Sequence, residues 1–148
     1  MIVIHRPAEG DEERFDARKI KTSEAQIVSR TTDMSWAQVK AGLLDGDPEA
    51  MRAIAWVIKK RTEPTLRYGD FDPEVEELVS RFDAREVADF CEQISKAPGT
   101  EEEIDAAYDE AARHAADPEA AAEYIAKFRE GGPKEPASSK SKTSKSGS

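Results

Sequence analysis

Helix-start signals recur along this chain and restrict it to a mainly helical fold. Asp is followed directly by Pro three times, at Asp47-Pro48, Asp72-Pro73 and Asp117-Pro118. Asp is a strong N-cap, and Pro at the first helical position loses no hydrogen bond that the helix needs. The spacing of a capping box occurs three more times, in residues 23–26, 35–38 and 100–103. These signals predict a chain built from short helices.

Apolar side chains recur at helical intervals after each start. The predicted stripes are Ile27 and Val28; Trp36, Val39 and Leu43; Met51, Ile54, Ala55 and Ile58; Val75, Leu78, Val79 and Phe82; Val87, Phe90, Cys91 and Ile94; Ile104, Ala107, Tyr108 and Ala111; and Ala121, Ala122, Ile125 and Phe128. Beyond residue 20, no segment alternates with the period of two that a strand requires. Residues 1–5 and 14–20 are the two segments that can pair as a small hairpin. We therefore predict a mainly α fold with a short N-terminal β-hairpin.

Composition divides the chain into four parts. Residues 1–19 form an N-terminal arm or hairpin, and residues 20–96 form a helical core domain. Residues 97–130 hold eleven Ala and ten acids against three cations. Because Ala favours helix but buries little area, we expect an acidic helical extension that is thinly anchored. Residues 131–148 contain no large apolar side chain, which predicts a disordered basic tail.

The charge balance limits the class of partner. The chain has 31 acids and 22 bases, a formal net charge of −9. Affinity for nucleic-acid phosphates depends on clustered Lys and Arg, so net acidity argues against general DNA binding and suits a protein that meets other proteins. The apolar runs are too short to span a bilayer or to form a signal peptide, and we expect a cytoplasmic protein.

Candidate catalytic and metal-binding groups are sparse. The single cysteine, Cys91, falls on a predicted apolar stripe, where a small buried side chain is the usual role. His5 lies near a terminus that we expect to be frayed, and His114 lies in an Ala-rich helix. Nothing marks a pair of carboxylates as buried, as acid–base catalysis requires. We therefore expect no enzymatic activity, no metal site and no cofactor.

The helix expected from Pro48 onward has two interpretations. Trp56 lies about 140° from Met51 on a helical wheel, nearly opposite the apolar stripe. Either this is a central core helix with Trp56 covered by the N-terminal segment, or Trp56 belongs to a partner-binding surface. Lys59, Lys60 and Arg61 occupy the last turn, where cations complement the helix dipole without any nucleic acid.

Five short motifs follow one another within residues 20–72. They are Ile20-Lys-Thr-Ser-Glu24-Ala25, Thr32-Asp33-Met34-Ser35-Trp36, Gly46-Asp47-Pro48-Glu49-Ala50, Ala53-Ile-Ala-Trp56-Val57-Ile-Lys-Lys-Arg61 and Asp70-Phe71-Asp72. Together they resemble the tail assembly chaperones of long-tailed (siphovirus-type) phages that infect actinobacteria. Asp33 stands where that family usually has glycine, which bears on the geometry of one turn.

The resemblance implies a non-enzymatic role in the cytoplasm of an infected bacterium. Such chaperones bind the long helical tape-measure protein, keep it soluble and help to deliver tail tube protein. On this interpretation, partner contact involves the end of the central helix and the residues after it: Trp56, Arg61, Leu66, Tyr68 and Phe71. The same side chains could instead close the core.

Two other classes of function are also compatible with the sequence. One is a structural subunit of the particle, such as a head–tail adaptor, and the other is a small regulatory protein, including a helical DNA-binding regulator. The family is often made in a second, longer form by ribosomal slippage. Gly132-Pro133-Lys134 can be encoded by a slippery heptamer, so a longer form that replaces residues 135–148 is a hypothesis.

Overall fold

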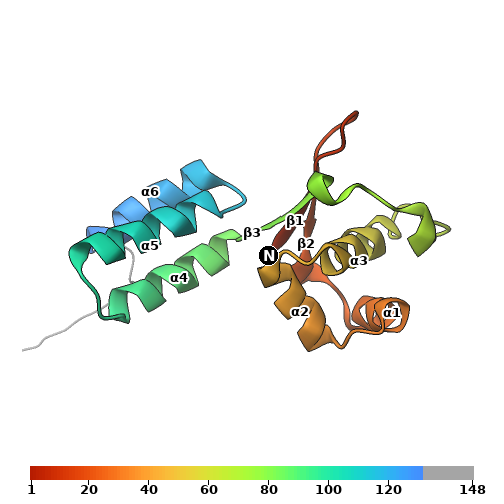
Figure 1. Cartoon of the computed structure of the whole chain (residues 1–148), viewed down its shortest axis with the longest axis horizontal. Coiled ribbons are helices and arrows are strands. Elements are labelled where there is room, and N and C mark those ends of the chain that lie inside the picture. The colour runs from red at the N-terminus through yellow and green to blue at the C-terminus, as the bar shows by residue number, and fades with distance from the viewer. Residues whose placement is uncertain (132–148) are drawn as a thin grey trace, which may run out of the picture. The chain divides into compact units, whose positions relative to one another are not determined.

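The described chain divides into two compact units, residues 1–81 and the described residues from 82 onward. The structure is a computed structural model, drawn in Figure 1, and it describes residues 1–131. Apart from Gly131, the tail expected over residues 131–148 lies outside the described residues. The prediction of a mainly helical fold is confirmed, since six α-helices dominate the described part of the chain.

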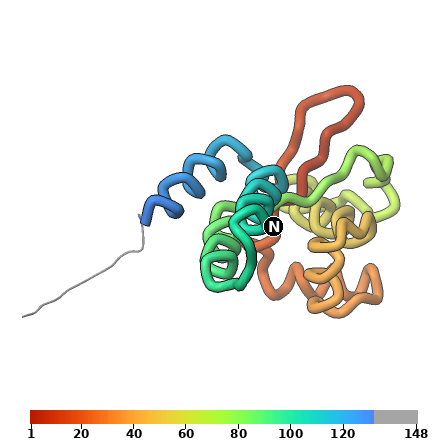
Figure 2. Tube along the Cα trace, turned by 60° about the vertical axis from the view of Figure 1, so that its left-hand side comes forward, coloured from red at the N-terminus to blue at the C-terminus, as the bar shows by residue number. Residues whose placement is uncertain are grey.

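A small antiparallel sheet begins the first unit. Its strands are β1 (Ile2–His5), β2 (Glu13–Asp16) and β3 (Leu78–Arg81), in the spatial order β2-β1-β3. The predicted hairpin is confirmed, because Val3 pairs with Phe15 across β1 and β2, and residues 6–12 form the loop shown in red in Figure 2. The expected fraying of the N-terminus is wrong: β1 is the central strand, and Val3 and Ile4 are fully buried.

The third strand replaces a helix that the sequence predicted. The stripe Val75, Leu78, Val79 and Phe82 does not form a helix; residues Val75–Glu77 make a short 3₁₀ turn, and β3 follows. β1 would otherwise leave one edge of buried backbone without partners, and such groups are costly to leave unpaired. Pairing of Ile4 with Val79 supplies those partners. Asp72 therefore caps no helix.

Three helices complete the first unit. They are α1 (Thr22–Thr32), α2 (Trp36–Asp45) and α3 (Pro48–Lys59). The predicted caps Ser35 and Asp47 accept backbone N–H bonds at the starts of α2 and α3. The capping box predicted to begin at Ser23 is misplaced by two residues. α1 begins directly after Lys21, whose backbone N–H donates to the carboxylate of Glu24.

Helix α3 is the central element of the first unit. Its buried side chains cover most of its circumference: Ala50, Met51, Ala53, Ile54, Ala55, Trp56 and Val57. The prediction that α3 is a core helix is confirmed, since a helix apolar on most sides packs between neighbours. α2 approaches it closely at Gly42, where an added Cβ would lie only 2.8 Å from the Cβ of Ala50.

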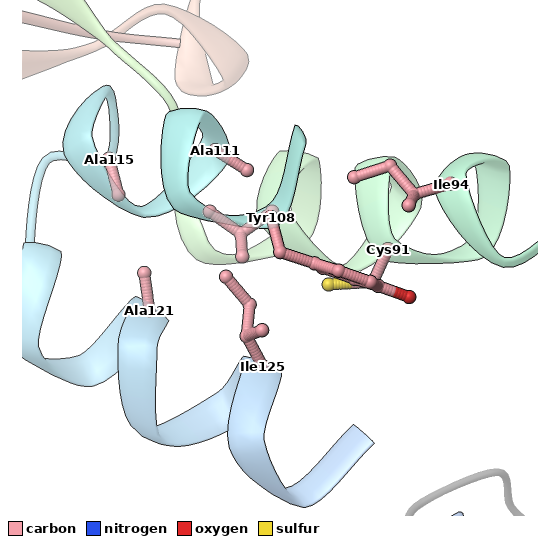
Figure 3. Packing of buried hydrophobic residues seen from close by; sticks show 8 residues of the cluster. Cys91, Ile94, Tyr108, Ala111, Ala115, Ala121 and Ile125 are labelled. Atoms are coloured by element: carbon pink, nitrogen blue, oxygen red, sulfur yellow. The ribbon is translucent and has the colours of Figure 1, made fainter. Parts of the chain in front are cut away.

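The second unit is a bundle of α4 (Ala84–Lys96), α5 (Glu101–Arg113) and α6 (Pro118–Arg129). Thr100 and Asp117 cap α5 and α6 as predicted, and Asp83 caps α4. Figure 3 shows the core, in which side chains from all three helices and from the turn after α5 meet: Cys91, Ile94, Tyr108, Ala111, Ala115, Ala121 and Ile125. We expected α4 to belong to the domain of residues 20–96, but its apolar face packs with α5 and α6.

The second unit begins at Phe82, directly after β3. The backbone N–H of Phe82 donates to the carbonyl of His114 at 2.8 Å, and the N–H of Ala116 donates back to the carbonyl of Phe82 at 2.8 Å. These two bonds fix the entry to α4 beside the turn that joins α5 to α6. Within residues 1–131, no helix has both the length and the apolar character needed to cross a membrane.

Candidate functional site

Trp56, the first residue of the predicted partner site, is held inside the first unit. Only 5% of its surface is exposed. Its indole Nε1 donates to the carbonyl of Leu66 at 3.0 Å, and the ring of Tyr68 meets it edge-on with centroids 5.2 Å apart. The residues that follow α3 therefore cover Trp56, whereas we had expected the N-terminal segment to do so.

Arg52 on α3 fixes the next part of the predicted site. Its Nε donates to the carbonyl of Phe71 at 2.7 Å, and its Nη2 donates to the carbonyl of Tyr68 at 2.8 Å. The guanidinium also lies 4.0 Å from the centre of the Tyr68 ring, a cation–π distance. Phe71 is buried and meets the ring of His5 edge-on. Burial raises the pKa of the Tyr68 hydroxyl.

The three cations at the end of α3 make internal contacts. Lys59 forms an ion pair with Glu13 of β2 at 3.0 Å, and Lys60 donates to the carbonyl of Pro64 at 3.0 Å. Arg61 donates from Nε and Nη2 to the two carboxylate oxygens of Glu24, each at 2.7 Å. This bidentate pair lowers the pKa of Glu24 and raises that of Arg61. The cluster therefore binds the unit's own elements together.

The structure separates the five residues of the predicted site into two groups. Trp56 contacts the carbonyl of Leu66 and the ring of Tyr68, and Arg52 ties the backbone of Tyr68 and Phe71 to α3. Arg61 reaches α1 instead. The Trp56 indole, the rings of Tyr68 and Phe71 and the Arg61 guanidinium all make contacts within the unit, and these contacts stabilise the fold.

A groove lies along α1, away from the predicted contact residues. Its volume is about 670 Å³, and it is open on one side. Ile20, Ala25 and Trp36 supply apolar surface, while Lys21 and Arg30 contribute positive charge. Ser35 caps α2 through a capping box with Gln38, which fixes Trp36 at the first position of that helix.

The residue pattern indicates this groove only weakly. We assigned Trp36 to the buried stripe of its helix together with Val39 and Leu43, but Trp36 is half-buried whereas those two are fully buried. A tryptophan at the first position of a helix lies at the edge of the packed face. The groove also needs α1 beside it, and sequence spacing does not show which helices are neighbours.

A second, smaller cavity of about 230 Å³ lies beside the start of α3. Pro48, Arg52 and Leu78 line it, together with Val75, which is 58% exposed. Asp72 contributes a carboxylate whose Oδ1 lies 4.0 Å from Nη2 of Arg52. The same guanidinium already donates to two backbone carbonyls. Its position beside this cavity is therefore explained by its role in the fold.

The second unit offers little reactive chemistry. Cys91 is fully buried in the core, and burial raises the pKa of its thiol, which disfavours the nucleophilic thiolate. His114 lies on the surface, with its Nδ1 2.9 Å from Oε2 of Glu110. Among residues 1–131, no three His, Cys, Asp or Glu side chains gather in a way that would hold a metal ion.

No family model, no curated protein and no solved structure matches this chain.

Proposed function

We propose that this protein is a tail assembly chaperone of a long-tailed phage, which binds the tape-measure protein and keeps it soluble while the tail tube assembles. It acts by stoichiometric binding in the cytoplasm of the infected bacterium, without catalysis. One observation carries the proposal. The first two of the five motifs shared with the chaperone family, residues 20–25 and 32–36, supply the apolar lining of the groove through Ile20, Ala25 and Trp36.

The remaining motifs support the proposal by building the frame around the groove. Arg61 ends the motif that begins at Ala53, and Glu24 belongs to the motif that begins at Ile20. Their ion pair joins these two separate motifs in space and holds α1 against α3. Gly46 ends α2 in a left-handed conformation, and Asp47 then caps α3. The motifs that begin at Gly46 and Ala53 thus support the helices beside the groove.

The physical properties of the chain suit a binding role. Tape-measure proteins are long helices with apolar faces, and a groove of this kind can cover one face of an amphipathic helix. A formal net charge of −9 would keep the loaded complex dispersed. The tail tube protein is the second proposed partner.

The direct test is co-expression with the tape-measure protein encoded in the same phage genome. We expect this chain to raise the soluble yield of the tape-measure protein and to copurify with it in a fixed ratio. An unrelated acidic helical protein of similar size serves as the control. Unchanged solubility with no copurification would refute the chaperone role.

A mass-spectrometric inventory of purified particles separates the chaperone from a virion subunit. A chaperone leaves the assembly, so its peptides should be missing from the finished particle. Finding them at a fixed copy number would favour a head–tail adaptor or another structural subunit.

The proposed longer form concerns residues 132–148, which lie outside the described part of the chain. An N-terminally tagged native gene, expressed with its downstream DNA, tests it by immunoblot. A minor product larger than the 16.4 kDa chain would indicate slippage, and a single band would eliminate it.

A further inference from the structure

The face of α1 that borders the groove has the dimensions of a helix-docking surface. Thr22, Ala25, Gln26, Ser29 and Arg30 all line the groove. They are spaced at i, i+3, i+4, i+7 and i+8 and therefore share one face of the helix. This face runs for about 12 Å, or roughly two turns. The small side chains of Ala25 and Ser29 leave room for a partner backbone to approach.

Trp36 forms an apolar wall of the groove and also carries an unused donor. Its side chain is half-buried, so it keeps surface available for contact. Within residues 1–131, no hydrogen bond engages its indole N–H. Trp56 contrasts with it, because that indole donates to Leu66 inside the unit. A rigid aromatic side chain with a free donor is a common anchor for a bound peptide.

The charge of the groove is opposite to that of the chain. Lys21 and Arg30 both line it, and none of the described residues that line it is Asp or Glu. No ion pair within residues 1–131 engages the Arg30 guanidinium. Glu24 interacts electrostatically with Lys21, but its carboxylate already accepts two hydrogen bonds from Arg61. A cationic groove on a chain of net charge −9 is complementary to an anionic occupant.

We propose that this groove binds an amphipathic helix of the partner that carries carboxylates at the edges of its apolar face. The apolar face contacts Ile20, Ala25 and Trp36, and the carboxylates pair with Lys21 and Arg30. These two cations are nine residues apart, about 13 Å along the direction of α1, so the matching carboxylates lie two to three helical turns apart. This inference rests on the proposed function, because it specifies which segments of the tape-measure protein the chaperone selects.

Two synthetic peptides of about 14 residues, long enough for roughly four helical turns, test the binding. Both have leucines along one face; one has glutamates at its edges with the required spacing, and the other has lysines there. Fluorescence anisotropy with the full chain measures affinity, and amide chemical shifts locate the contact. We expect the glutamate peptide to bind at least about tenfold more tightly and to shift α1 amides and the Trp36 indole.

Charge reversal provides the matched variants. Lys21→Glu/Arg30→Glu changes the groove, whereas Arg85→Glu/Lys127→Glu makes the same change of net charge on exposed residues of the second unit. Arg30 and Lys127 each lie in the last turn of a helix, so the two double variants place a comparable unfavourable charge there. We expect the groove variant to weaken the glutamate peptide about tenfold or more and the control variant to change it less than about twofold.

Several results would overturn the proposal. These are no shift of α1 amides at millimolar glutamate peptide, equal binding of the lysine peptide, or equal loss in both double variants. Competition by a short DNA duplex that depends on Lys21 and Arg30 would assign the groove to phosphate instead. The co-expression assay tells the two proposals apart: if the wild-type chain fails to solubilise the tape-measure protein, the function fails, and if the groove variant solubilises it as well as wild type, only the groove proposal fails.

Discussion

At the scale of the residue, the side chains expected to contact a partner are the ones that hold the first unit together. Trp56 combines burial, an edge-on contact with Tyr68 and a hydrogen bond to Leu66. Aromatic residues with one polar atom appear both at interfaces and in cores. Sequence does not distinguish the two cases, because the covering segment starts ten residues after Trp56 and its path depends on Arg52.

Trp56→Ala should destabilise the protein by about 3–5 kcal/mol, since it opens a cavity and removes the indole hydrogen bond to the carbonyl of Leu66, which would keep only its longer bond from Lys60. Trp56→Phe keeps most of the volume and should cost about 1–3 kcal/mol. Urea unfolding measures both. At a temperature where Trp56→Phe remains folded, we expect the tape-measure protein to be solubilised as well as by wild type. Lost activity with retained stability would place Trp56 in the partner site after all.

The pair of Glu24 and Arg61 predicts a defined pH dependence. The bidentate hydrogen bonds lower the pKa of Glu24 below its ordinary value of 4.5. The pair therefore contributes fully above pH 4.5, and its contribution is lost as the pH falls through the lowered folded pKa. Glu24→Gln should cost about 0.5–1 kcal/mol at pH 7, and the difference from wild type should shrink below pH 4.5.

Denaturant unfolding across this pH range measures the effect of Glu24→Gln, and Arg61→Ala supplies the reference background. With Arg61 removed, Glu24→Gln should have little effect at any pH. A wild-type advantage that persists undiminished into acid, or that survives Arg61→Ala, would show that the carboxylate stabilises α1 in another way.

At the scale of the element, the helices were predictable where a cap and an apolar stripe agree. α3, α5 and α6 begin at the predicted residues because Asp47, Thr100 and Asp117 accept backbone bonds locally. β3 was not predictable, since its side chains have helical spacing and its pairing partner β1 lies more than seventy residues away. Local signals fixed the helix starts, whereas long-range pairing decided the strand and the neighbours of α4.

The contact between α2 and α3 depends on the absence of a side chain at Gly42. Gly42→Ala would gain about 1 kcal/mol of helix propensity. It would also place a Cβ 2.8 Å from that of Ala50, on a neighbouring helix that has no flexible atom to move. We expect a net destabilisation of about 1–2 kcal/mol by thermal or urea unfolding. Gly69→Ala is the control, because an added Cβ there meets nothing within 4 Å; equal effects would contradict the proposed close packing.

At the scale of the whole molecule, the sequence placed the boundary between domains at residue 96, and the structure places it at residue 81. The prediction relied on composition, which changes at the Ala-rich segment. The apolar stripe of α4 instead completes the core formed by α5 and α6, with Cys91 and Ile94 among its members. Ala-rich helices bury little area by themselves, so a bulkier third helix supplies what their core lacks.

Because each unit closes a hydrophobic core of its own, we expect the two units to lose protection against hydrogen exchange separately. Ile125→Ala should cost the second unit about 2–5 kcal/mol and speed amide exchange in α4, α5 and α6, while exchange in α1 to α3 stays unchanged. Ile54→Ala is the matched variant in the first unit and should give the reverse pattern. Hydrogen–deuterium exchange read by mass spectrometry measures both. If either variant accelerated exchange across residues 1–131 as a whole, the chain would unfold as one cooperative body, and the groove along α1 would then depend on the integrity of the second unit.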